Sequence, residues 1–194
     1  MTWIEYAAAA FGIASVYLSA RQNVWNWPLG ILNVALYTIV FYHDKLYATM
    51  GLQVVYILLA GYGWWHWLHG GANRGALLVS RVPTREAVIL AIGFVGATAG
   101  LFTLLWRATD ASLPLVDSAL TAASLVAQYM MTRKYLEAWV LWMVVDVAYV
   151  VTFVHQRLWP TAGLYLVFCG LAVVGWREWR DSLRRRAAGE AVYA

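Results

Sequence analysis

The chain has 194 residues, of which 62% are hydrophobic and only 12% are Asp, Glu, Lys or Arg. Soluble domains carry roughly 25% charged residues, so the composition excludes a soluble fold and predicts an integral membrane protein. The net charge of +4 does not indicate a nucleic-acid-binding face, because the basic residues stand between apolar runs. Cys169 is the single cysteine, which excludes an intrachain disulfide.

Seven apolar stretches are long enough to cross a bilayer as helices. In chain order they cover residues 3–20, 24–41, 47–68, 86–106, 115–132, 135–153 and 159–177. Short polar breaks separate most of them, and one longer hydrophilic loop runs from Leu68 to Arg85. The basic tail from Arg180 to Ala194 is expected to be frayed. The sequence therefore predicts an all-α membrane protein with seven transmembrane helices.

The basic residues predict how the chain crosses the membrane, because loops rich in Lys and Arg stay in the cytoplasm. With seven crossings, eleven of the fourteen Lys and Arg residues fall on one side. The other side has only Lys45, Arg107 and Arg157. We therefore expect the N-terminus outside and the C-terminus in the cytoplasm.

An internal repeat relates the first three predicted helices to the last three. A shift of 112 positions places Tyr17 on Tyr129, Arg21 on Arg133, Trp27 on Trp139 and Phe41 on Phe153. Two triplets joined by one helix point the same way through the membrane, so we predict a 3+1+3 parallel repeat, an architecture found in transporters. The predicted parts are a first repeat at 1–68, a loop and linking helix at 69–112, a second repeat at 113–179 and a basic cytoplasmic tail at 180–194.

Polar side chains inside a membrane span are costly, which makes them candidates for function. Asp146 lies in the middle of the sixth predicted helix, and Asn33 lies at a similar depth in the second. We expect them to face each other across one cavity, although a structural pairing of Asp146 with a neighbouring helix stays open. Gln53 in the third helix is a weaker candidate, because an interhelical hydrogen bond explains it equally well.

Two Trp-x-x-Trp pairs occupy matching places in the repeat, Trp64 with Trp67 and Trp176 with Trp179. Residues three apart share a helix face, so each pair can stack a flat ring or hold a cation. The alternative is a belt at the membrane interface, and we favour that interpretation more for the second Trp of each pair. No motif for a catalytic residue, a metal site or a bound cofactor is recognisable.

Two motifs resemble the PnuC family of bacterial vitamin transporters. The first is Asn33-x-x-x-Tyr37-x-x-x-Phe41, followed by Leu52-Gln53, Tyr56 and Tyr62-Gly63-Trp64. The second is Trp142-x-x-Val145-Asp146-x-x-Tyr149, followed by Leu164-Tyr165 and Gly175-Trp176. The resemblance covers both triplets and implies a seven-helix fold like that of the SWEET sugar transporters. The substrate-binding residues it leads us to expect are Asn33, Tyr37, Gln53, Trp64, Asp146, Tyr149 and Trp176.

The resemblance also implies facilitated uptake of nicotinamide riboside across the bacterial inner membrane, made one-way by a cytosolic kinase. Thiamine or another vitamin stays an alternative, because thiamine is also flat, cationic and hydroxylated. A membrane enzyme acting on a lipid-soluble substrate is the alternative from another class, but the sequence has one buried carboxylate rather than a catalytic set. The partners expected are the vitamin and the lipid bilayer, with no nucleic acid, and homo-oligomer formation stays open.

Overall fold

A computed structural model describes residues 3–43, 47–108 and 113–189. Within these ranges the chain forms seven α-helices and a short 3₁₀ turn, η1 (Ala72–Arg74). The helices are α1 (Trp3–Ala20), α2 (Asn26–His43), α3 (Tyr47–His69), α4 (Thr84–Ala108), α5 (Pro114–Thr132), α6 (Glu137–His155) and α7 (Trp159–Ala187). Each predicted apolar stretch coincides with one helix, so the predicted all-α fold is confirmed. The predicted break at 43–45, the boundary at 112 and the end of the tail at 190–194 reach outside the described residues.

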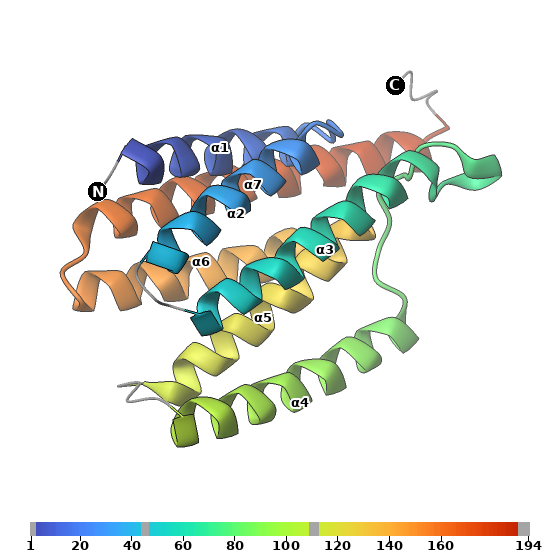
Figure 1. Ribbon diagram of the computed structural model, residues 1–194. Helices are drawn as coiled ribbons and strands as arrows, with labels where there is room; N and C mark the ends of the chain where they lie inside the picture. The colour runs from blue at the N-terminus through green and yellow to red at the C-terminus, as the bar shows by residue number, and fades with distance from the viewer. Residues whose placement is uncertain (1–2, 44–46, 109–112, 190–194) are drawn as a thin grey trace.

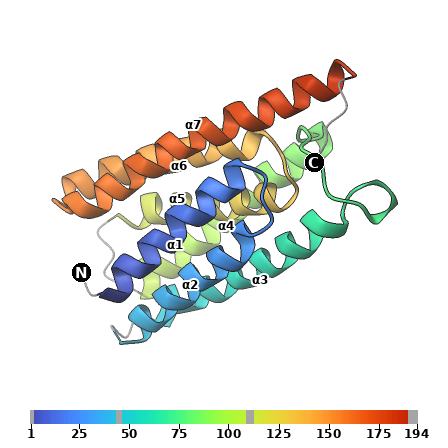
Figure 2. The same ribbon diagram turned by 90° about the horizontal axis from the view of Figure 1, so that it is seen from above.

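The helices form a bundle from which α4 stands apart (Figure 1). Seen from above, α1 lies between α2 and α7 (Figure 2). Helix α1 packs on α2 and α7, α2 packs on α3, and α6 packs on α5 and α7. Helix α5 connects α3 with α4 and α6, because it contacts all three of these helices. Among the described helices, the segments 84–107, 137–155 and 159–187 are long and apolar enough to cross a membrane, and a shorter apolar segment covers 6–20.

The helix ends follow local sequence signals. Pro114 and Pro160 stand in the first turns of α5 and α7, where the missing N–H of proline costs nothing. Helices α1 and α5 end in turns of the same geometry, with Gln22 and Lys134 in the left-handed region at φ of 57° and 52°. The next residue in each turn donates its N–H back to Leu18 (2.9 Å) or Met130 (3.1 Å). These two turns are 112 positions apart.

The core at one end of the bundle consists of four tryptophans, which we call the tryptophan core: Trp27, Trp67, Trp139 and Trp179, all at most 2% exposed. Trp27 and Trp67 meet edge to face with ring centroids 5.3 Å apart, and Trp139 and Trp179 do so at 5.4 Å. Trp67 lies against Trp179 at 5.9 Å, which joins the two pairs. The core therefore packs α2, α3, α6 and α7 together.

Hydrogen bonds to neighbouring turns hold the two central rings of this core. Trp67 Nε1 donates to the Met131 carbonyl at 3.0 Å, and Trp179 Nε1 donates to the Ser19 carbonyl at 3.1 Å. Ser19 and Met131 are themselves 112 positions apart. Since buried indole N–H groups need an acceptor, these bonds select one orientation for each ring. The interface-belt interpretation is thus wrong for Trp67 and Trp179, because interhelical packing buries them completely.

Two glycines permit the edge-to-face pairs to form. A Cβ added at Gly175 would lie 2.5 Å from ring carbons of Trp139, and one at Gly63 would collide with Trp27 in the same way. We expect Gly175→Ala to destabilise the protein by about 1–3 kcal/mol, the usual cost of overpacking. Thermal unfolding of the detergent-solubilised protein measures this effect.

Gly163→Ala is the matched control, because it lies on the same helix and a Cβ there meets nothing within 4 Å. This control should be neutral or stabilise the helix by up to about 1 kcal/mol. Equal unfolding midpoints for the two variants would contradict the packing described for Trp139.

The loop at 70–83 docks across the end of the bundle that holds the tryptophan core. Ser80 N–H donates to the Lys134 carbonyl at 3.0 Å, and the Ser80 carbonyl accepts from Leu136 N–H at 2.9 Å. From α7, Arg186 Nη1 donates to the Val79 carbonyl at 2.9 Å, and Val79 is 1% exposed. The expectation of a frayed tail from Arg180 is therefore wrong for residues up to Ala187, because this contact and buried Ser182 anchor the end of α7.

Lys134 is buried under this loop, with Nζ 4.4 Å from the Trp67 ring centroid and 2.8 Å from the Leu77 carbonyl. The ring and the carbonyl favour the ammonium form, but burial dominates and lowers the pKa of Lys134 to about 8. The unfolded chain, with an ordinary lysine pKa near 10.4, then binds more protons between about pH 8 and pH 10.4. The free energy of unfolding should therefore rise with pH across that window. Below pH 8 the contribution of Lys134 should not depend on pH.

We expect the unfolding midpoint of the parent to rise relative to that of Lys134→Met as the pH is raised from 8 to 10. Lys134→Arg stays charged throughout and serves as the control, so it should show no such gain over the Met variant. A parent midpoint that falls relative to Lys134→Met over this window would have the wrong sign for a buried lysine.

Candidate functional site

A group of tyrosines lies next to the acid that the sequence singles out. Asp146 on α6 is 4% exposed, and Tyr149 follows one turn later on the same helix. The Tyr149 ring lies 4.9 Å from that of Tyr165 on α7. Tyr165 is also within electrostatic range of Asp146, of Tyr37 on α2 and of Tyr56 on α3. We call Tyr37, Tyr56, Tyr149 and Tyr165 with Asp146 the phenol cluster.

Ser124 of α5 lies beside the tyrosines of this cluster. Its hydroxyl donates to the Leu120 carbonyl at 2.8 Å and lies within reach of the hydroxyls of Tyr56 and Tyr149. Five helices thus contribute to the cluster, namely α2, α3, α5, α6 and α7. On α7 the cluster continues into Phe168, whose ring meets Tyr165 edge to face at 5.7 Å.

The Asp146 carboxylate has no cation and no hydrogen-bond donor against it among the described residues. A buried carboxylate is costly unless it is paired, so this position is suited to a ligand that brings the positive charge. The aromatic rings of Tyr149 and Tyr165 near the acid add to that preference, because their quadrupoles also attract cations. The cluster can therefore hold a flat cationic group and offer hydroxyls to its polar substituents.

The structure brings Tyr149 close to Asp146 and places Tyr37 near Tyr165, but the contacts of Asn33 lie elsewhere. Asn33 Nδ2 donates to the Ala8 carbonyl of α1 at 2.6 Å. Beside it, Gly12 leaves just enough room for the amide, since a Cβ there would lie 3.0 Å from Asn33 Nδ2. One amide N–H of Asn33 is thus used to join α1 to α2, and its contacts do not reach Asp146.

On α3, Gln53 lies on the same helix face as Tyr56, Ala60 and Trp67, at the spacings 3, 7 and 14. Ala60 and Trp67 are buried, so this face points into the bundle and the half-buried Gln53 lies on the cluster side. Among the described residues Gln53 makes no hydrogen bond to another side chain. Its amide therefore stays available near the phenol cluster.

The two Trp-x-x-Trp pairs divide between different environments. Trp64 is 39% exposed, and Trp176 is half-buried under the Arg180 guanidinium at 4.6 Å. Their partners Trp67 and Trp179 belong to the tryptophan core. The rings of each pair therefore do not form one common stacking face, because the helix turns the second ring into the interhelical packing.

Sequence reasoning missed Tyr56, Ser124 and Tyr165 as members of the site. The 112-position shift contains the missing signal, since Tyr165 is the counterpart of Gln53 and Tyr149 is the counterpart of Tyr37. Ser124 is the counterpart of Gly12, and Tyr56 is that of Phe168. Within the described residues no three His, Cys, Asp or Glu side chains come close enough to hold a metal ion.

Comparison with known protein families places nearly the whole chain in one of them. A family model described as nicotinamide mononucleotide transporter matches residues 2–181. The nicotinamide riboside transporter PnuC of Escherichia coli (strain K12) is 27% identical, over 97% of this chain and 89% of that protein. The riboflavin/roseoflavin transporter RibM of Streptomyces davaonensis is also 27% identical, over 94% of this chain and 87% of its own length.

The fold has a counterpart among solved structures. The crystal structure of the vitamin B3 transporter PnuC superimposes with a TM-score of 0.75, covering 94% of this chain and 83% of that chain. The sequence identity to that structure is 24%, so this likeness supports the fold rather than the substrate.

Proposed function

The chain belongs to the nicotinamide mononucleotide transporter family, and from this premise we propose that it carries nicotinamide riboside into the cell by facilitated diffusion. It is a membrane transporter and not an enzyme. The relatives that it matches along most of their length are transporters as well. The proposed substrate rests on Asp146, a buried carboxylate with no cation beside it among the described residues and with Tyr149 and Tyr165 close by. A pyridinium ring supplies the missing positive charge, and its riboside supplies hydroxyls for Gln53 and the tyrosines.

The same cluster argues for the nucleoside over its 5′-phosphate. No Lys or Arg belongs to the phenol cluster, while nicotinamide mononucleotide brings a phosphate that Asp146 repels. A phosphorylated product is therefore poorly bound on the inner side. Phosphorylation by a cytosolic kinase would trap the vitamin without any coupling ion.

Calorimetric titration of the purified protein with nicotinamide riboside, thiamine, riboflavin and nicotinamide mononucleotide tests this assignment. We expect nicotinamide riboside to bind most tightly and the mononucleotide to bind weakest. Tighter binding of thiamine would support a cation-binding site but assign a different vitamin to it. Tighter binding of uncharged riboflavin, the substrate named for a relative, would remove the role given to the charge of Asp146.

We propose that residues 1–68 and 113–179 are two parallel repeats, that residues 69–112 link them and that a basic tail follows from residue 180. The matching contacts at residues 112 positions apart support this division: the two indole pairs, the two glycines beneath them, the two helix-end turns and the two indole hydrogen bonds. Transport would then consist of one repeat rocking against the other around the phenol cluster.

The tryptophan core is the proposed barrier on the cytoplasmic side. It lies at the loop-covered end of the bundle, and the indole N–H groups of Trp27 and Trp139 have no acceptor there among the described residues. Each unpaired buried donor costs about 1–3 kcal/mol, so separation of the rings regains part of this energy when water enters. A closed core would thus be stable yet able to open.

Orientation in the bacterial inner membrane follows from the distribution of basic residues, with the N-terminus outside and the C-terminus in the cytoplasm. We expect green fluorescent protein fused after Ala194 to fluoresce and alkaline phosphatase at the same place to be inactive. Alkaline phosphatase fused before Thr2 should be active. Fluorescent fusions at both ends would require an even number of crossings and contradict the 3+1+3 arrangement.

A further inference from the structure

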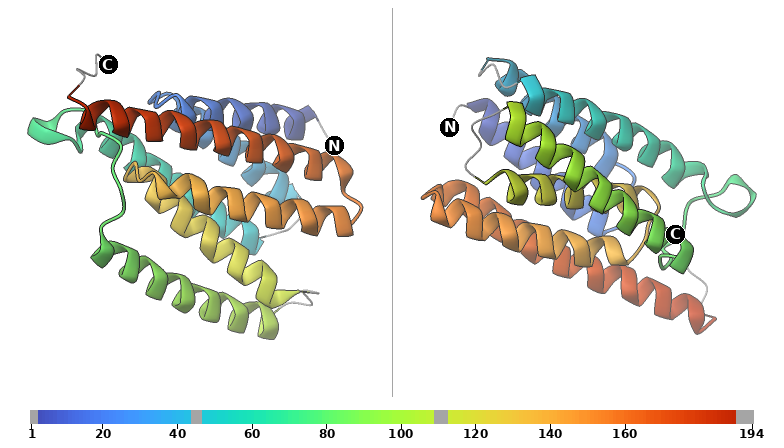
Figure 3. Two further views of the ribbon diagram at one scale, coloured as in Figure 1. Left: turned by 180° about the vertical axis from the view of Figure 1, so that it is seen from behind. Right: turned by 90° about the horizontal axis from the view of Figure 1, so that it is seen from below.

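Helix α4 leaves an open apolar groove between itself and the bundle. It packs along α5 and stands away from α6 and α7 (Figures 1 and 3). The groove between α4, α5 and α6 has a volume of about 510 Å³. Its walls include Leu90 and Phe94 of α4, Ala123 and Val126 of α5, and Leu141 and Val144 of α6. Such a groove, open sideways, is filled by an apolar chain and not by water.

The length of the groove corresponds to one leaflet of the membrane. Along α5 its lining runs from Ala119 to Met130, which at 1.5 Å per residue is about 16 Å. Half of a hydrocarbon core of about 30 Å is about 15 Å. The Met130 end lies next to loop 70–83 and the basic residues that we place in the cytoplasm. The groove therefore has the dimensions of one acyl chain of the cytoplasmic leaflet.

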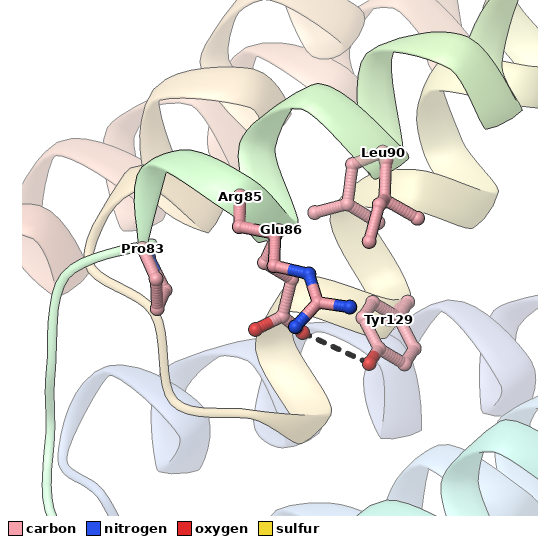
Figure 4. Close-up of a pocket in the computed structure, with 6 residues that line it drawn as sticks. Pro83, Arg85, Glu86, Leu90 and Tyr129 are labelled. Atoms are coloured by element: carbon pink, nitrogen blue, oxygen red, sulfur yellow. Dashed lines mark hydrogen bonds between the residues drawn. The ribbon is translucent and has the colours of Figure 1, made fainter.

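A second cavity of about 360 Å³ adjoins the groove, since Leu90 lines both (Figure 4). In this view the Arg85 guanidinium extends over Glu86 and Tyr129. Within the described residues Arg85 makes no hydrogen bond or ion pair, and neither does the exposed Arg81 nearby. Arg85 lines the second cavity and Arg81 precedes Val82, which lines the groove, so both cations lie near the same end of the groove.

Glu86 forms no ion pair with Arg81 or Arg85, and its carboxylate contacts other groups. Tyr129 donates to it at 3.0 Å, Tyr135 donates to its other oxygen, and Arg133 Nε lies 3.8 Å away. The one acid in the groove, Glu137, accepts from Val82 N–H at 3.0 Å. Two cations that have no ion-pair partner among the described residues, at one end of an apolar groove, favour an anionic headgroup over a zwitterionic one.

We propose that this groove binds one anionic phospholipid of the cytoplasmic leaflet, with an acyl chain between α4 and α5/α6 and its phosphate at Arg85 and Arg81. The bound lipid fills the space behind Val145, next to Asp146, and holds α4 against the second half of the bundle. The leaflet assigned to the lipid rests on the orientation proposed above. The lipid site itself does not depend on which vitamin is carried.

Native mass spectrometry of the full chain, titrated with dioleoyl phosphatidylglycerol or dioleoyl phosphatidylcholine, tests this site. Phosphatidylglycerol should bind more tightly, and Arg81→Gln/Arg85→Gln should weaken it about 30-fold, since each cation near an anionic lipid contributes about fivefold. Arg107→Gln, at the other end of α4, is the matched control and should leave the affinity unchanged. Ala123→Phe fills the groove and should reduce the binding of both lipids.

Equal affinity for the two lipids, or equal loss in the Arg107 variant, would overturn the proposal. Competition by glycerol 3-phosphate alone would also overturn it, because that result would indicate a site for free anions. So would a dimer without bound lipid, in which a second copy of the chain covers the groove. Thermal unfolding without added lipid shows whether each variant is folded. Vitamin titration of the same samples separates a failure of this site from a failure of the proposed substrate.

Discussion

Asp146→Asn should weaken binding of nicotinamide riboside by about 1.5–3 kcal/mol, or about 10- to 150-fold, the range found for hydrogen bonds and contacts to charged groups. The substitution keeps the shape of the side chain and removes the charge that faces the ligand. Because Asp146 has no other cation against it among the described residues, the lost attraction belongs to the ligand and not to a neighbouring helix. Calorimetric titration of both proteins measures the difference.

Dihydronicotinamide riboside is the matched control ligand, since its ring has nearly the same shape without the positive charge. It should bind the parent poorly and lose nothing further in Asp146→Asn. If both ligands lose affinity equally, Asp146 acts through packing and not through charge.

The same variant separates passive from proton-coupled transport. Asp146 is the acid placed near the middle of the membrane, so proton coupling would run through it. In proteoliposomes we expect parent and variant alike to equilibrate nicotinamide riboside, whether or not a pH gradient is imposed. Accumulation above the outside level by the parent, lost in Asp146→Asn, would show that the passive mechanism is wrong.

Trp179→Ala should destabilise the protein by about 3–5 kcal/mol, as expected for the truncation of a buried tryptophan. Trp179 is 0% exposed and contacts both Trp67 and Trp139, so its removal leaves a cavity at the centre of the tryptophan core. It also removes one of the two hydrogen bonds that the Ser19 carbonyl accepts and leaves the one from Gln22 N–H. The unfolding midpoint in detergent and the yield of folded protein measure the effect.

Trp176→Ala is the comparison on the same helix, three residues earlier. Its half-buried ring lies under Arg180 and packs against the core from outside, so its truncation should destabilise the protein less than Trp179→Ala. If it stacks on the vitamin, its substitution weakens binding by about 1–3 kcal/mol. Equal stability of both variants would contradict the core position of Trp179.

The helices and the membrane setting could be predicted from the sequence, because both depend on properties that add up along the chain. Apolar length and the low share of charged residues identify each helix without knowledge of its neighbours. Asp146 could be identified as a candidate for the same reason, since an acid within an apolar run is recognisable without knowledge of how the helix packs. The extension of α7 past Arg180 was missed because it depends on a contact with Val79, about a hundred positions away.

The direction in which each helix presents its side chains was decided only by the tertiary structure. Sequence spacing placed Trp64 beside Trp67 and Trp176 beside Trp179, but burial in the four-helix contact separates the members of each pair. Asn33 turns to the Ala8 carbonyl because Gly12 leaves room there, and no local pattern shows that choice. Tyr56, Ser124 and Tyr165 join Asp146 for the same reason: which polar groups meet inside a membrane depends on how helices far apart in the sequence pack, and one apolar helix face looks like another until its partner is known.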